Sequence, residues 1–312
     1  MDIQTSFSSS SAADSHSSLH IHTVEEQGEG GETGCQNSGN GRSLRTQGKM
    51  MTLLFLGDVV GEPGRLAMYR LLPELRREFE ADAVVVNGEN AAGGRGITPR
   101  IAHEFLNQGV DVITLGDHAW DQAELGPWLR EEPRVLRPFN LQPGTPGVGS
   151  IIIETPAGSL GVLCLEGRSF MKPGPENPFT RGKAEALRLR EAGASALLVD
   201  FHAEATSEKI ALGYHLDGVA SAVLGTHTHV QTADARILPG GTASMCDVGM
   251  CGSLNGVIGR ESGPVLDGYV TGLPCKLPVG GWPAQVNGAA VRVDVASGRA
   301  VSIQPFQRTC TP

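Results

Sequence analysis

The sequence predicts a layered α/β fold with mixed sheets. From Thr52 onward, short runs rich in β-branched residues and leucine alternate with helical patterns, which is typical of βαβ units. Towards the C-terminus, the runs TASMC, AAVRVDV and AVSIQPF predict further strands with no helix between them. Of the 312 residues, 40% are hydrophobic, so the chain has ample material for a large core.

Seven strands and two helix signals can be placed in order along the chain. The segment TPRIAHEFLNQG predicts a helix with Thr98 as its N-cap, Pro99 in its first turn and Gly109 at its end. The segment DQAE at residues 121–124 predicts a capping box that begins another helix. The expected strands cover residues 52–56, 82–86, 110–115, 150–154, 160–165, 196–200 and 219–224.

The N-terminal segment differs from the rest of the chain in composition. It contains the low-complexity stretches SFSSSSAADSHSS and GEGGETG, which cannot bury apolar area. The sequence MMTLLFLGDVVG, which begins at Met50, is typical of a natural protein start. We therefore expect residues 1–49 to be a disordered extension and residues 50–312 to form the folded domain.

Composition argues against several classes of protein. The net charge is −9 and no basic run is interleaved with aromatic residues, which disfavours a broad nucleic-acid-binding surface. No apolar stretch has the length of a membrane helix and no secretory signal is visible, so a cytoplasmic protein with reduced cysteines is expected. The P-loop, dinucleotide and G-x-S-x-G signatures are all absent, which disfavours kinases, dehydrogenases and serine hydrolases.

Five of the expected strands are each followed by side chains that can bind a metal. In open α/β sheets the carboxyl ends of the strands share one edge, so these side chains should converge in space. Glycine at position 225 would allow a close approach of the backbone there. The candidates are Asp58, Glu89 and Asn90, Asp117 and His118, His202, and the pair His227 and His229 that flanks a single threonine.

The donor atoms in this set indicate the kind of metal. All are oxygen or nitrogen, which suits manganese, iron or zinc better than Cu(I) or an iron–sulfur cluster. There are too many donors for one ion with open positions, so two ions are implied. Two ions can hold a bridging hydroxide and a phosphate for in-line hydrolysis of a phosphoester. They would also supply the positive charge that an acidic chain lacks.

Each candidate also has a simpler structural explanation. Asp58 could be a turn or N-cap residue, and Glu89 and Asn90 could serve only the turn chemistry of a glycine-rich loop. The histidines, taken singly, could be ordinary hydrogen-bonded side chains, which is the interpretation we adopt for His103 and His215. Taken together, the structural explanation needs five coincidences at strand ends, so a metal site is favoured.

These residues lie in long motifs that resemble one known family. The motifs are LFLGDVVGEPGR, VVNGENAAGGRGIT, DVITLGDHAWDQ, EEPRVLRPFN, VDFHAEATSEKIALG, VLGTHTHVQTADARILPGGTA and VGMCGSLNGVIG. Over about residues 50–304 the chain is similar to the YmdB-like branch of the calcineurin-type metallophosphoesterases. The resemblance implies a four-layer αββα sandwich, a dinuclear iron or manganese centre, and hydrolysis of phosphodiesters, characteristically nucleoside 2′,3′-cyclic phosphates.

The resemblance also implies a role for each candidate residue. His118 would be the proton donor, and Glu89 would bridge the two metals. One metal would be held by Asp58, Asn90 and His229, and the other by Asp117, His202 and His227. The family has asparagine where this chain has Asp117, which adds one negative charge to the site. We therefore expect a weaker attraction for an anionic diester.

Other assignments stay open at this stage. The same centre could belong to a regulator that binds cyclic nucleotides or RNA 2′,3′-cyclic phosphate ends with weak turnover, or to a phosphomonoesterase. The resemblance weakly implies a homo-oligomer. Asp121 could orient His118 or only cap a helix, and Asp200 and Glu204 could support ligand histidines or face solvent. The Gly- and Pro-rich segment 166–182 is expected to line the substrate pocket.

Overall fold

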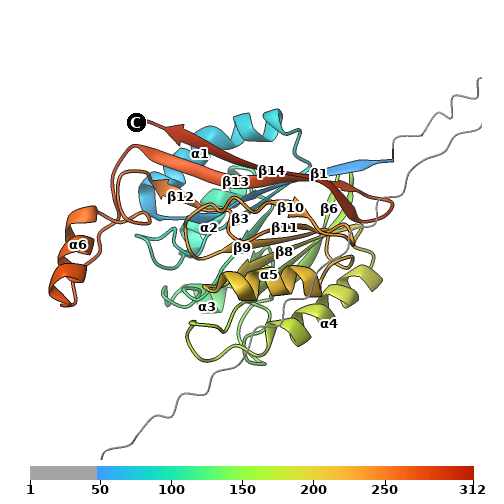
Figure 1. Ribbon diagram of the computed structural model, residues 1–312, viewed down its shortest axis with the longest axis horizontal. Coiled ribbons are helices and arrows are strands. Elements are labelled where there is room, and N and C mark those ends of the chain that lie inside the picture. The colour runs from blue at the N-terminus through green and yellow to red at the C-terminus, as the bar shows by residue number, and fades with distance from the viewer. Residues whose placement is uncertain (1–47) are drawn as a thin grey trace, which may run out of the picture. The chain divides into compact units, whose positions relative to one another are not determined.

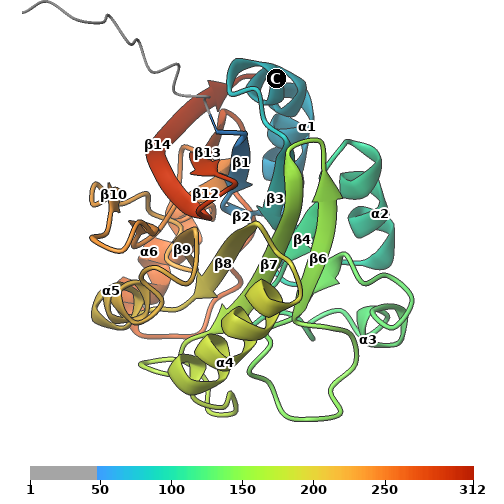
Figure 2. The same cartoon turned by 90° about the vertical axis from the view of Figure 1, so that its right-hand side faces the viewer.

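The computed structural model describes residues 48–312, so almost all of the extension predicted for residues 1–49 lies outside the described residues. Two sheets pack face to face, and helices cover their outer faces (Figure 1; Figure 2). The predicted four-layer αββα architecture with mixed sheets is therefore confirmed.

The first sheet is built on parallel strands from the N-terminal half and closed by antiparallel strands from the C-terminus. Its strand order is β2-β12-β13-β1-β3-β4-β5, with β14 paired to β13. Strands β1, β3, β4 and β5 are parallel, whereas β13 runs antiparallel to β1, β12 and β14. The bounds are β1 Met50–Leu56, β2 Asp58–Val59, β3 Ala83–Asn87, β4 Val112–Thr114, β5 Val135–Leu136, β12 Met250–Ser253, β13 Ala284–Asp294 and β14 Arg299–Cys310.

The second sheet is also mixed, with parallel strands at its centre. Its order is β10-β11-β9-β8-β7-β6, in which β7, β8, β9 and β11 are parallel and the two edge strands are antiparallel. The bounds are β6 Ser150–Thr155, β7 Gly158–Glu166, β8 Ala196–His202, β9 Ala222–Thr226, β10 Arg236–Ile237 and β11 Ala243–Met245.

The helices divide between the two outer faces, except for the last one. Helices α1 and α2 lie on the first sheet, α4 and α5 lie on the second, and α6 stands apart at one end of the domain (Figure 1). The bounds are α1 Gly61–Glu78, α2 Pro99–Asn107, α3 Leu125–Trp128, α4 Pro178–Glu191, α5 Thr206–His215 and α6 Ser262–Thr271.

Three apolar clusters fill the spaces between the four layers. Because side chains alternate along a strand, Leu54 faces the helices while its neighbour Phe55 faces the other sheet. The cluster under α1 and α2 also contains Phe105, and the cluster under α4 and α5 contains Phe201. Burial on both faces explains why the central strands read as continuous apolar runs.

Most local predictions are confirmed, and two are wrong. Helix α6 lies between the strands formed by TASMC and AAVRVDV, where no helix was expected; its segment SGPVLDGYVT contains two glycines and buries only Val265, so it lacks the apolar periodicity that would have indicated a helix. All seven expected strands are present, and α2 begins after Thr98, whose hydroxyl accepts a hydrogen bond from the amide of Ile101. The capping box predicted at residues 121–124 does not form. Helix α3 begins at Leu125, and its N-cap residue Glu124 makes no side-chain capping bond. The carboxylate of Asp121 instead contacts the side chains of Arg95 and His118.

Two features bear on cellular context. Among residues 48–312, no helix has both the length and the apolar character needed to cross a membrane. The cysteines within this range are free thiols, as expected, and Cys35 lies outside it.

Candidate metal centre

The predicted ligands lie together where the carboxyl ends of both sheets meet. Strands β1, β3 and β4 of the first sheet lead into Asp58, Glu89 and Asp117. Strand β8 of the second sheet ends at His202, and β9 leads into the turn that carries His227 and His229. Five of the seven ligand candidates are buried, and Asp117 and His227 are partly buried.

Four of these side chains could bind a single cation. Ligand atoms of Glu89, Asp117, His202 and His227 all lie within 4.8 Å of one another. The Nε2 atom of His202 is 3.2 Å from Glu89 Oε1, 3.3 Å from Asp117 Oδ1 and 2.9 Å from His227 Nδ1. Two carboxylate oxygens and two imidazole nitrogens at this spacing form a donor set of the kind that iron, manganese or zinc takes.

The other three candidates form a second group beside the first. The Nε2 atom of His229 is 3.8 Å from Asp58 Oδ1 and 3.3 Å from Asn90 Nδ2. The amide of Asn90 also donates to Glu89 Oε1 at 3.0 Å, which links the two groups. Asp58 Oδ1 is buried without any hydrogen-bond partner. A buried anionic oxygen without a partner is costly, and a cation would satisfy it, so the residues present fit a metal ion.

The orientation of His202 is fixed from behind by a buried network. Its Nδ1 atom lies 2.9 Å from the hydroxyl of Thr226, which donates in turn to Asp200 Oδ1 at 2.7 Å. Asn87 and Thr114 also donate to the carboxylate of Asp200. Since the Thr226 hydrogen is used on Asp200, His202 Nδ1 must be the donor, and its Nε2 lone pair faces the centre. Asp200 therefore supports a ligand histidine through Thr226 rather than facing solvent.

The other two histidines are held in comparable ways. His229 Nδ1 donates to the carbonyl of Ile258 at 3.0 Å, which leaves Nε2 free for a cation. His227 Nε2 lies 3.3 Å from the half-exposed carboxylate of Glu204, while Nδ1 faces the centre.

The turn between β9 and these histidines is strained and is fixed by a buried ion pair. His227 and His229 have φ angles of 101° and 64°, which non-glycine residues rarely adopt. Thr228, between them, donates from its amide and its hydroxyl to Asp247 Oδ2. Lys209 Nζ lies 2.7 Å from the same oxygen, and both charged side chains are almost fully buried.

Gly225 is required just before this turn. A Cβ atom at this position would lie 1.8 Å from the carbonyl oxygen of Cys246, on the neighbouring chain segment. The close approach expected at Gly225 is therefore an approach between two backbones, and it brings Asp247 under the histidine turn.

Burial and mutual contact shift the pKa values of these groups in opposite directions. Burial raises the pKa of Asp58 to about 6. Burial also disfavours the charged form of Glu89, but His202 outweighs it and lowers the pKa of this carboxyl. Burial opposes protonation of His202, yet the carboxylates around it raise its pKa well above the usual value. Burial and the proximity of His202 lower the pKa of His227 to about 4. Without a cation, protonated His202 therefore supplies positive charge next to the carboxylates that a metal ion would otherwise neutralise.

His118 lies at the edge of the centre with a carboxylate behind it. Its Nδ1 atom is 3.0 Å from Asp121 Oδ2, and Arg95 Nε is 3.0 Å from the same oxygen. Asp121 therefore orients His118 instead of capping a helix, because its carboxylate contacts both His118 and Arg95.

A cavity of about 820 Å³ opens onto the centre. Part of its wall is formed by residues of the metal centre and its surroundings: Glu89, Asn90, His118, His227 and His229. The rest of the wall includes Arg95, Ile258, Arg260, Tyr269, Cys275, Lys276 and Leu277. The prediction that segment 166–182 lines this cavity is wrong, because the chain after β12 and around α6 takes that place. The segment reaches the site only through Lys172, whose Nζ lies 3.0 Å from Asp117 Oδ2.

Several residues that matter here were not predicted from the sequence. Asp247 follows β11 in the way that the predicted ligands follow their strands, so the same rule could have found it. Lys172 lies in segment 166–182, which was expected near the substrate, but nothing in the sequence singled it out as a partner of Asp117. Arg260 lies in an irregular segment with no sequence signal of its own.

Known proteins with similar sequences show the family to which the chain belongs. A model of the family described as YmdB-like protein matches residues 54–306, which is most of the chain. The chain belongs to the YmdB-like family. Among its relatives is the 2′,3′-cyclic-nucleotide 2′-phosphodiesterase of Bacillus subtilis, which is 42% identical over 255 residues, covering 81% of this chain and 96% of that protein.

Solved structures of similar chains share the fold. A hypothetical protein from Thermus thermophilus is 43% identical, with a TM-score of 0.77, and the match covers 84% of this chain and 100% of that one. A novel phosphatase from Mycoplasma pneumoniae is 33% identical, with a TM-score of 0.79, over 84% of this chain and 94% of that one. A 5′-nucleotidase precursor from T. thermophilus is only 13% identical, with a TM-score of 0.53 over 84% of this chain and 55% of that one, so it shows the fold alone.

In this member of the YmdB-like family, we predict that Lys209→Met disrupts the histidine turn. The substitution leaves Asp247 buried and unpaired, which should lower the free energy of unfolding by about 3–5 kcal/mol. Chemical denaturation followed by circular dichroism measures the loss. Arg100→Met is the control, because it removes an exposed ion pair with Glu104 and should cost under about 1 kcal/mol. Equal effects of the two substitutions would contradict the role assigned to the buried pair.

Proposed function

We propose that this protein is a metal-dependent phosphodiesterase that hydrolyses nucleoside 2′,3′-cyclic phosphates. The observation that carries the proposal is the pair of adjoining donor groups joined through Glu89 and Asn90, with a buried oxygen of Asp58 that lacks a partner. The activity of the Bacillus subtilis relative supports the choice of substrate. Iron or manganese suits the mixture of carboxylate, amide and imidazole donors, and zinc is a further candidate.

The proposed assignment gives each metal three ligands of its own and one shared ligand. His202, His227 and Asp117 would hold one cation, and Asp58, Asn90 and His229 would hold the other. Glu89 lies between the two groups of side chains and would be shared by both. Two divalent cations held there would supply positive charge to the phosphate and acidity to a water molecule.

The protein's own groups supply the rest of the chemistry. In the proposed reaction His118 donates a proton to the departing ribose oxygen. Asp121 accepts a hydrogen bond from His118 Nδ1, so the proton to be transferred is carried on Nε2. Arg95 contacts the same carboxylate at 3.0 Å.

Lys172 bears on the alternative function, a regulator with weak turnover. That alternative rests on the extra negative charge that Asp117 brings to the centre. The ammonium of Lys172 contacts Asp117 Oδ2 and offsets this charge, while Oδ1 stays turned towards His202. Burial opposes ionisation of Asp117, but contacts with His202 and Lys172 bring its pKa well below the usual value. The offset favours an active enzyme. A phosphomonoesterase with the same centre remains the second candidate, on the evidence of the phosphatase among the similar structures.

The proposed function is tested by metal content and substrate range together. Protein purified without chelator should contain two iron or manganese ions per chain and hydrolyse adenosine 2′,3′-cyclic phosphate faster than adenosine 3′,5′-cyclic phosphate or a phosphomonoester. Removal of the metal should abolish turnover, and added Mn²⁺ should restore it. Metal-loaded protein that binds the cyclic nucleotide without forming product would instead identify a regulator.

His118→Ala is predicted to separate proton donation from metal binding. Turnover should fall by about 100-fold or more, because a general acid is lost, while the metal content is unchanged. Asp121→Asn should weaken turnover less, since the imidazole remains. Steady-state kinetics and metal analysis of the same preparations give both quantities. A His118→Ala enzyme with the turnover of the unaltered protein would exclude the role.

The effect of removing the charge of Lys172 on KM is predicted to depend on whether residue 117 is an aspartate. Lys172→Gln should raise KM for the anionic diester by about 2- to 5-fold, as expected for an ion pair that is largely exposed on one side. The same substitution made in an Asp117→Asn background should have little effect, because no charge is left to offset. Asp117→Asn alone should retain both metals. An equal effect of Lys172→Gln in both backgrounds would show that the pair is incidental.

A further inference from the structure

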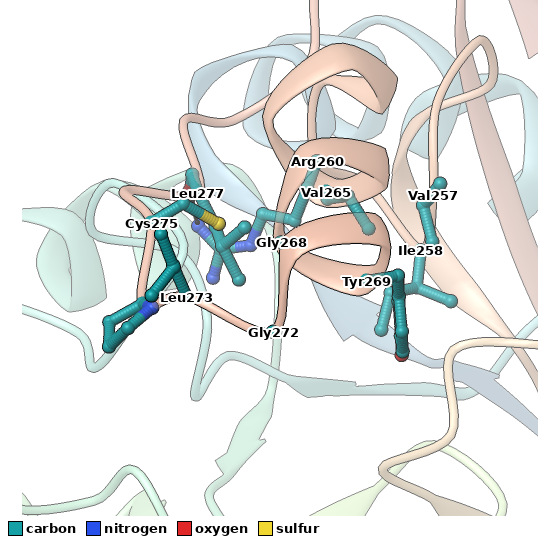
Figure 3. A pocket seen from close by; sticks show the side chains of 11 residues that line it. Val257, Ile258, Arg260, Val265, Gly268, Tyr269, Gly272, Leu273, Cys275 and Leu277 are labelled. Atoms are coloured by element: carbon teal, nitrogen blue, oxygen red, sulfur yellow. Dashed lines mark hydrogen bonds between the residues drawn. The ribbon is translucent and has the colours of Figure 1, made fainter.

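A second cavity shares a wall with the one over the metal centre. It has a volume of about 560 Å³ and lies beside α6 (Figure 3). Both cavities are lined by the same five residues: Ile258, Arg260, Tyr269, Cys275 and Leu277. The two spaces are therefore neighbours, and one elongated ligand could occupy both.

The second cavity is apolar and open. Val257, Val265 and Leu273 line it together with the shared residues. Tyr269 is 81% exposed and Leu273 is 67% exposed, which is unusual for large apolar side chains. In Figure 3, Tyr269 and Ile258 lie on one side of α6, and Arg260 lies on the other, near Cys275. An exposed apolar surface beside a proposed active site is typical of a ligand-binding surface.

The shared wall also carries Arg260, which forms no ion pair with a carboxylate among residues 48–312, whereas its neighbour Arg95 is paired with Asp121. The guanidinium of Arg260 donates to the backbone carbonyls of Gly94 and Leu277, at 2.5 Å and 3.0 Å. Burial lowers the pKa of Arg260, and the charge of Arg95, which lines the same cavity, lowers it further. Lys276 also lines this cavity. The carboxylate of Glu204 lines it too but contacts His227, so Arg260 and Lys276 are the cations there that an anion could meet.

We propose that this wall binds the nucleotide that precedes the cyclic phosphate at the 3′ end of an RNA strand. The phosphate of that nucleotide would lie beside Arg260 and Lys276, and its base would enter the apolar cavity against Tyr269. The inference rests on the proposed function, because the terminal cyclic phosphate is the group at the metal centre. The preferred substrate is then an oligoribonucleotide end rather than a free nucleotide.

The combination of surfaces favours a strand end over the other occupants of an apolar face. The cavity over the metal centre is lined by cationic side chains, and the adjoining cavity is apolar and includes the aromatic ring of Tyr269. A strand end offers the scissile phosphate, a second phosphate and a second base. Bases of single-stranded RNA stack on aromatic side chains, whereas a second copy of this chain would gain little from cations placed next to the centre.

Three substrates test the inference: adenosine 2′,3′-cyclic phosphate, its 5′-phosphorylated form, and the dinucleotide ApA with a terminal 2′,3′-cyclic phosphate. We expect kcat/KM to rise in that order, with the dinucleotide about 5- to 50-fold above the nucleoside form, as one stacked base and one phosphate contact would give. Equal values for all three would overturn the inference and leave the proposed function intact. Hydrolysis of none of them by metal-loaded protein would overturn both.

Two substitutions locate the effect on the wall. Tyr269→Ala should lower the ratio of the dinucleotide value to the nucleoside value by about 5-fold or more. Lys276→Gln should lower the ratio of the 5′-phosphorylated value to the nucleoside value by a few fold. Tyr214→Ala is the matched control, because Tyr214 is also an exposed tyrosine on a helix but lines neither cavity. Ratios unchanged by Tyr269→Ala, together with an altered oligomeric state in sedimentation, would assign this face to self-association and overturn the inference.

Discussion

The structure depends on the accumulation of carboxylates at one buried edge. Asp58, Glu89 and Asp117 converge where water is largely excluded, and their mutual repulsion must be balanced. Without a metal, the proton on His202 provides part of that balance, at the expense of burying an imidazolium. Asp58 Oδ1 still lacks a hydrogen-bond partner. A cation bound at this edge would satisfy that oxygen and offset the remaining repulsion, and the surrounding contacts hold the side chains that could bind it.

The support comes from behind each imidazole rather than from the centre itself. Thr226, held by Asp200, fixes His202, and the carbonyl of Ile258 fixes His229. The turn that carries two of the histidines is anchored through Thr228 to Asp247. These contacts come from the second sheet and from the loop before α6, and Asn87 and Thr114 of the first sheet donate to Asp200. The face-to-face packing of two sheets is therefore what sets the ligand geometry, since neither sheet supplies a complete donor set.

Sequence could predict the ligands because a single rule governs them: each follows a strand, and parallel strands end at one edge. It could not predict contacts whose partners lie in irregular segments. The segment DQAE resembles a capping box, yet Asp121 is occupied by His118 and Arg95, so tertiary contacts override the local pattern. Lys172 and Arg260 reach the site from loops whose paths no periodicity encodes. Asp247 was within reach of the strand-end rule, but its partner Lys209 lies 38 residues earlier in the chain, so the sequence did not indicate the buried pair.

The position of the proton donor connects the two proposals. Arg95 contacts Asp121, which orients His118, and Arg95 also lines the cavity wall that Arg260 contributes to. The proposed acid and the proposed strand-binding wall therefore border the same cavity. In a ribose 2′,3′-cyclic phosphate at a strand end, one sugar carries both the leaving oxygen and the link to the preceding nucleotide. That sugar has to lie next to His118 for the oxygen to be protonated, and the preceding nucleotide then extends into the cavity that His118 shares with Arg260. The geometry of proton donation thus directs the strand along the cationic wall, whereas a free nucleotide would leave that wall without a ligand.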